Sequence, residues 1–76
     1  MTEMQIRKRI AKCATLFGFI YNKKEGNVDP YSPSEFLLYF DGNELTVHSI
    51  DEVMDTAFFD GKSLSEITND VIITDW

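Results

Sequence analysis

The apolar residues at the start of the chain recur with the period of an α-helix. Thr2 and Gln5 have the spacing of a capping box, in which each side chain satisfies a free backbone N–H of the first turn. We therefore expect an amphipathic helix over residues 2–17, ended by Gly18. The apolar stripe of this helix consists of Ile6, Ile10, Cys13, Ala14 and Phe17. The basic flank consists of Arg7, Lys8, Arg9 and Lys12.

The next segment is harder to assign. Residues 19–21 predict a short strand, or a continuation of the helix if Gly18 does not end it. Residues 22–34 are rich in Gly, Pro, Asn and Ser, a composition that predicts a loop. Tyr31 is an aromatic residue among the polar residues of this loop. It either anchors the loop to the core or contacts a partner.

The apolar run over residues 36–40, followed by Asp41-Gly42, predicts a β-hairpin over residues 35–48. If these two residues form a type I′ turn, Phe40 lies opposite Asn43 and Leu38 lies opposite Leu45. The predicted core face then carries Phe36, Leu38, Phe40, Leu45 and Val47. The other face carries Leu37, Tyr39 and Thr46 together with Glu35, Glu44 and His48.

A second interpretation of the same stretch is a short helix. Ser32, Pro33 and Glu35 also match a capping box with proline at the first helical position. Residues 36–40 would then be helical, and residues 44–48 would form a lone strand. We favour the hairpin, because consecutive apolar and aromatic residues followed by Asp-Gly are typical of a strand and its turn.

The last third of the chain predicts two helices and a strand. Ser49 with Glu52 opens a helix over residues 50–59, which ends at Asp60-Gly61. A further capping box at Ser63 opens a shorter helix, and an apolar strand follows over residues 71–74. We expect one domain over residues 1–76. Its fold class is α+β, with the N-terminal helix packed on a small, mostly antiparallel sheet and the last strand paired beside the hairpin.

Charge changes this picture more than composition does. The net charge is −6, but residues 1–24 carry +5 and residues 25–76 carry −11. This division indicates either contacts between the two parts of one molecule or two surfaces with different partners. No apolar run approaches the roughly 20 residues that cross a bilayer, and Cys13 is the only cysteine. We expect a reduced, cytoplasmic protein without membrane contact.

Candidate chemistry is sparse. His48 is the only histidine, and periodicity places the only thiol, Cys13, on an apolar stripe, so a Cys–His pair is not expected. Asp41, Asn43 and Glu52 approach the spacing of a calcium loop, but Thr46 stands where that loop needs glycine. We expect no catalytic residues, no metal and no cofactor.

These observations favour a non-catalytic protein-interaction module of a bacterial or phage type, encoded by a phage or mobile element. The expected contact residues are Tyr31, Leu37, Tyr39 and Thr46, or the edge of the last strand with Trp76. The same apolar surfaces could join two copies of the chain in a homodimer. In both cases the partner is a protein.

Two alternatives use the charge. Asp51, Asp55 and Asp60 could imitate phosphate and block a basic, nucleic-acid-binding protein. Some nuclease inhibitors encoded by phages and mobile elements act in this way, and this chain is similar to them in size and charge alone. Binding of nucleic acid by the basic N-terminal helix is the weaker alternative, because the rest of the chain would repel the same polyanion.

Overall fold

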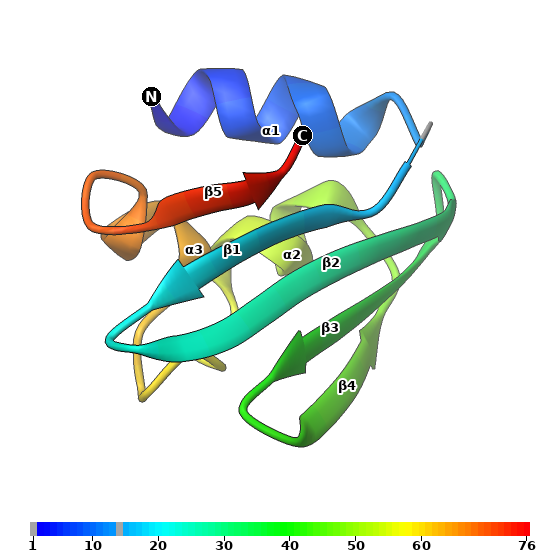
Figure 1. The fold of residues 1–76 in the computed structure, drawn as a ribbon. Coiled ribbons are helices and arrows are strands. Elements are labelled where there is room, and N and C mark those ends of the chain that lie inside the picture. Colours follow the sequence, from blue (N-terminus) through cyan, green and yellow to red (C-terminus); the bar gives the residue numbers. More distant parts are fainter. Residues whose placement is uncertain (1, 14) are drawn as a thin grey trace.

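The chain forms a five-stranded antiparallel sheet with helices on one of its faces (Figure 1). This computed structural model describes residues 2–13 and 15–76. The strand order is β4-β3-β2-β1-β5, which confirms the predicted α+β class. The elements, in chain order, are α1 (Glu3–Ala11), β1 (Phe17–Tyr21), β2 (Lys24–Ser32), β3 (Glu35–Phe40), β4 (Asn43–Val47), α2 (Ile50–Asp55), α3 (Leu64–Ile67) and β5 (Ile72–Asp75).

Helix α1 is shorter than predicted. Its capping box at Thr2 is present, but the helix ends at Ala11, and Cys13 adopts a positive φ of 53°. Phe17 was predicted on the helix and instead begins β1, where it is buried together with Phe19. Two phenylalanines two residues apart share one face of a strand, and that burial outweighs the helical period. Ala14 lies outside the described residues.

The predicted loop over residues 22–34 is wrong, because most of it is strand β2. Asn22 and Lys23 have φ values of 56° and 64°, so they form the two-residue turn of a β1–β2 hairpin. Gly26 fits because a Cβ there would lie 2.7 Å from the Phe19 ring. Pro30 fits because pairing with β1 ends at Val28, so the N–H that proline lacks is not needed on that side.

The β3–β4 hairpin has the predicted register, with Leu38 opposite Leu45 and Phe40 opposite Asn43. Asp41 and Gly42 both have positive φ, as a type I′ turn requires. The alternative of a short helix over residues 36–40 is therefore wrong. Leu45 differs from expectation in being 38% exposed, because β4 is an edge strand with a neighbour on one side only.

Strand β5 pairs with β1 and not beside the hairpin, so the predicted neighbour was wrong. Its place as an edge strand, which its sequence also allowed, is confirmed. Helix α2 ends at Asp55, shorter than predicted, because Phe59 turns inward. The Phe59 ring lies 5.5 Å from both Phe19 and Phe40, so it joins the sheet to the helical layer.

Candidate functional site

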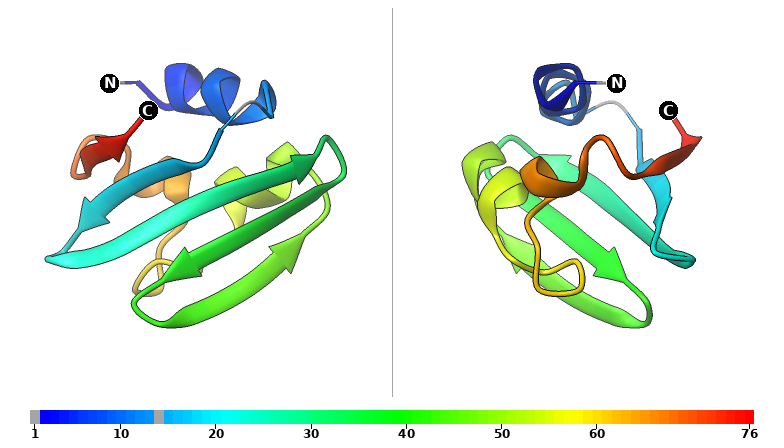
Figure 2. Two further views of the ribbon diagram at one scale, coloured as in Figure 1. Left: turned by 45° about the vertical axis from the view of Figure 1, so that its right-hand side comes forward. Right: turned by 90° about the vertical axis from the view of Figure 1, so that its left-hand side faces the viewer.

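Among residues 2–13 and 15–76, every helix lies on one face of the sheet, and the other face carries none. Figure 2 shows α1, α2 and α3 gathered on the same side of the strands. The core lies between them and the sheet, where Phe17, Val28 and Leu38 are buried. Side chains alternate along each strand, so the residues between these core positions face the other way. We call this second side the uncovered face; its strand residues include Gly18, Ile20, Glu25, Asn27, Asp29, Leu37, Tyr39, Glu44, Thr46 and Ile72.

The centre of the uncovered face is partly apolar. Tyr39 lies opposite Asn27 and Leu37 lies opposite Asp29 in the β2–β3 ladder, and both apolar side chains are half-buried. Ile20 is paired with Ile72 of the edge strand β5, and the Ile72 side chain is 66% exposed. Apolar side chains from three strands, β1, β3 and β5, are thus available on this face.

Carboxylates surround this apolar centre. The strand register places Glu25 and Asp29 on β2, Glu44 on β4 and Asp75 on β5 on the uncovered face. Lys24 is the one basic residue within the strands, and its Nζ is on the helical side, 5.9 Å from the centre of the Phe40 ring. The uncovered face is therefore acidic, with no lysine or arginine at its strand positions.

A shallow hollow of about 190 Å³ lies on this face. Gly18 is one of its lining residues, and a Cβ there would lie 3.1 Å from Cβ of Asp75 and 3.2 Å from Oγ1 of Thr74. Glu25 and Asp75 both line it. A cationic side chain of a partner would meet carboxylates there.

Four of the predicted contact residues lie on this side of the sheet or at its end. Leu37, Tyr39 and Thr46 are on the uncovered face, and Leu37 pairs directly with Thr46. Tyr31 occupies a bulge between Pro30 and Ser32, at the end of β2, and is 57% exposed. The structure therefore places these four in one region.

The three predicted phosphate-mimicking acids lie elsewhere, on the helical side. Asp55 is exposed at the end of α2, whereas Asp51 forms an ion pair with Arg7 of α1. Asp60 lies in the turn before α3. Two of the three charges are thus engaged within the molecule.

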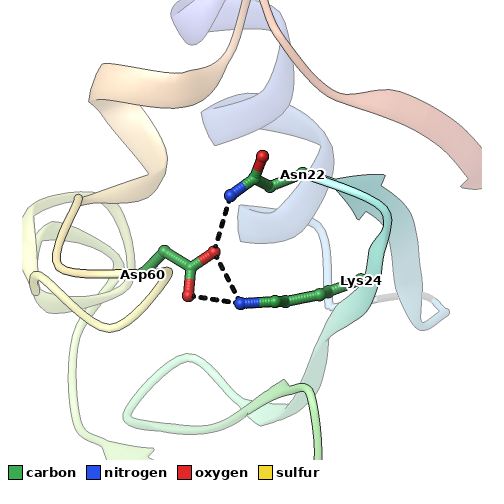
Figure 3. Close-up of polar contacts among 3 residues, drawn as sticks. All are labelled: Asn22, Lys24 and Asp60. Carbon is green, nitrogen blue, oxygen red and sulfur yellow. Dashed lines mark hydrogen bonds and ion pairs between the residues drawn. The ribbon is translucent and has the colours of Figure 1, made fainter.

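Asp60 is held by two side chains of the β1–β2 hairpin (Figure 3). Asn22 Nδ2 donates to its Oδ2 at 3.1 Å, and Lys24 Nζ donates to its Oδ1 at 2.9 Å. The hydrogen bonds from Asn22 and Lys24 lower the pKa of Asp60. The hydrogen bond to Asp60 raises the pKa of Lys24. This contact ties the 59–62 turn to the sheet.

Trp76 was predicted as a contact residue at the edge of β5. Its ring packs edge-on against Phe17, with 5.8 Å between ring centres, and it is 49% exposed. Arg9 was predicted on the solvated flank of the helix, but it is buried. Its Nε donates to the carbonyl oxygen of Trp76 at 2.8 Å, and its guanidinium lies 5.5 Å from the indole centre.

The two most reactive side chains, the imidazole of His48 and the thiol of Cys13, do not form a common site. His48 Nδ1 is 3.3 Å from the carbonyl oxygen of Ser34, while Cys13 packs against the core. Within residues 2–13 and 15–76, no three His, Cys, Asp or Glu side chains are arranged to hold a metal ion. In that same part of the chain, no helix has both the length and the apolar character needed to span a bilayer.

The contribution of β2, β1 and β5 to the uncovered face was missed from the sequence. The signal was present in β2, where Gly26, Val28 and Pro30 alternate with Glu25, Asn27 and Asp29. Glycine and proline at the inward positions concealed this alternation, because both residues are typical of loops.

Comparison of the chain with protein-family models, with curated proteins and with solved structures finds no match.

Proposed function

We propose that the chain is a non-catalytic protein-interaction module that binds a basic protein partner on the uncovered face. One observation carries the proposal. Leu37, Tyr39 and Ile20 form an apolar centre, and the charged strand residues around it are all carboxylates. A surface of this kind suits a partner with an apolar patch surrounded by lysine or arginine.

Each part of the face has its own role in this proposal. Tyrosine is enriched among the residues that dominate binding energy, because it buries a large rigid ring and retains a polar tip. Tyr39 is the central candidate, and Leu37 extends its apolar area. The carboxylates of Glu25, Asp29 and Glu44 speed the encounter and select cationic partners, in a manner that salt weakens.

The sheet edges offer a related mode of binding. Strand β4 has β3 as its neighbour on one side, and its residues from Asn43 to Thr46 are all exposed. A partner strand added there would extend the uncovered face through main-chain hydrogen bonds. The same addition between two copies of the chain would give the homodimer expected from the sequence.

A second candidate function, imitation of phosphate, draws on different acids from those first expected. Asp51 and Asp60 already pair with Arg7 and Lys24. The acids on the uncovered face make no ion pair within the described residues. A phosphate-mimicking surface would therefore use Glu25, Asp29, Glu35 and Glu44, and its partner would be a nucleic-acid-binding protein.

We place the module in the cytoplasm, where a reducing environment maintains the free thiol of Cys13. An origin in a phage or mobile element remains a prediction from size and charge. The proposed contact surface depends neither on the cytoplasmic location nor on this origin.

The test is capture of partners from lysate by the immobilised chain and by matched variants. Leu37→Ser with Tyr39→Ser removes the apolar centre, while Met4→Ser removes a more exposed apolar residue from α1. We expect a basic partner to bind the wild type and the Met4 variant, to elute with salt, and to be lost from the double variant. Circular dichroism checks that each variant is folded.

Charge reversals test whether the partner binds the acids of the uncovered face or the acids of the helical side that the sequence first suggested. Glu25→Lys with Asp29→Lys should abolish capture, while Asp55→Lys on α2 should leave it intact. Equal loss from the Asp55 variant would show that the helical side carries the contact. Retention by the Leu37/Tyr39 variant would contradict the proposed role of the apolar centre.

A further inference from the structure

A second hollow lies between α1 and the end of β5. It has a volume of about 360 Å³ and is lined by Gln5, Lys8, Arg9, Lys12 and Trp76. Three of these five residues are cations and none has a carboxylate side chain. This volume is near the lower end of the range of about 300–1,000 Å³ found for ligand sites, so it suits one small ligand.

The lysines of this hollow are placed to meet an anion. Lys8 lies on α1 and Lys12 is the residue that caps its C-terminal end; they are one helical turn apart, so their side chains project from the same face. Among the described residues, Arg7 and Lys24 are paired with Asp51 and Asp60, whereas no carboxylate pairs with Lys8 or Lys12. Two unpaired cations beside one cavity, in a chain of net charge −6, form a local site for negative charge.

Trp76 supplies a flat wall to the same hollow. Arg9 fixes its position by donating to the Trp76 carbonyl oxygen, and it also donates to the carbonyl and hydroxyl oxygens of Thr15. Because these acceptors occupy the Arg9 donors, Arg9 is a positioning residue, and Lys8 and Lys12 remain for a ligand. Trp76 is 49% exposed as a residue, and the part of its indole that Arg9 does not cover can stack on a nucleobase.

We propose that this hollow binds a free mononucleotide, with its phosphate at Lys8 and Lys12 and its base against Trp76. The combination of two lysines and one aromatic wall in a single small cavity selects a ligand that has both a phosphate and a flat ring. A longer nucleic acid strand is disfavoured, because its further phosphates would approach the carboxylates of a chain with net charge −6. The proposal is independent of the uncovered face and its partner.

The test uses the full chain with AMP, adenosine, inorganic phosphate and a single-stranded oligonucleotide as probes. Trp76 is the only tryptophan, so its fluorescence reports on this site alone. We expect a saturable change with AMP, with a Kd at or below about 1 mM. Adenosine and phosphate, each lacking half of the ligand, should bind about tenfold more weakly or worse, as should the oligonucleotide.

Variants identify the residues. Lys8→Gln with Lys12→Gln should weaken AMP binding about tenfold or more, because charge-assisted contacts to phosphate are lost. Lys23→Gln with Lys62→Gln makes the same change in net charge at exposed positions outside the hollow, and should leave the affinity within about twofold. Three results would overturn the proposal: no saturable change with AMP, equal loss in both double variants, or an oligonucleotide that binds more tightly than AMP.

Discussion

The buried guanidinium of Arg9 holds the backbone of Trp76, with Nε of Arg9 2.8 Å from the Trp76 carbonyl oxygen. The two residues are 67 positions apart, so this contact joins the first helix to the end of the last strand. Arg9 also donates to the Thr15 and Leu16 carbonyl oxygens in the link between α1 and β1. One side chain thereby fixes three segments.

We predict that Arg9→Met lowers the free energy of unfolding by about 2–4 kcal/mol, because buried acceptors lose charge-assisted hydrogen bonds. Arg7→Met is the matched control. The partner of Arg7 is Asp51, whose side chain is 71% exposed, so we expect a loss below about 1 kcal/mol. Urea unfolding followed by circular dichroism measures both values. Equal losses would show that Arg9 does not anchor the two ends of the fold.

The pKa of Asp60 gives stability a defined pH dependence. Hydrogen bonds from Asn22 and Lys24 lower the pKa of this carboxyl below its usual 3.8 in the folded state. The stabilisation is therefore complete above pH 3.8 and is lost as the pH falls through the lowered folded value. In Asp60→Asn, we expect the unfolding temperature to lie below that of the wild type at neutral pH.

The difference between the two proteins should shrink as the pH falls below 4, because the wild type then loses the same ion pair. Thermal unfolding recorded from pH 2 to pH 7 measures it. Asp55→Asn provides the control, since Asp55 is an exposed acid that makes no ion pair with any residue of 2–13 or 15–76. A constant difference in unfolding temperature between the wild type and Asp60→Asn across the whole pH range would show that titration of Asp60 is not the cause of the pH dependence.

Gly26 is required by packing and not by backbone conformation. A Cβ at this position would lie 2.7 Å from Cζ of Phe19 and 3.0 Å from Cδ1 of Phe40, both in the core. We predict that Gly26→Ala costs about 1–3 kcal/mol of unfolding free energy, as overpacked cores do. Glu25→Ala, one residue earlier on the uncovered face, should change it by about 0.5 kcal/mol or less. Chemical denaturation of both variants tests the contrast.

Local patterns were sufficient where the stabilising contacts are local. The β3–β4 register could be predicted because Asp41-Gly42 selects the turn and the alternating residues select the face. Capping boxes at Thr2 and Ser63 could be predicted for the same reason, since each closes within four residues. These elements are specified by neighbours in the sequence.

Elements that depend on distant contacts could not be predicted. Gly26 and Pro30 are residues typical of loops. Gly26 is accommodated in β2 because the Phe19 ring fills the space that a side chain would need, and Pro30 is accommodated because the pairing with β1 ends at Val28. The pairing of β5 with β1 is a contact between opposite ends of the chain, which no local pattern specifies. The candidate site follows the same division: Leu37 and Tyr39 were found from the hairpin, whereas the β1 and β2 parts of the face and the place of β5 beside β1 were missed.

The central claim is that a basic protein partner binds the uncovered face, and an NMR titration of the isotopically labelled chain with the captured partner tests it most directly. We predict amide shift changes centred on Asn27, Leu37 and Tyr39, reduced by added salt. Changes confined to α2 and the turn at Asp60 would contradict the claim, because they would place the partner on the helical side.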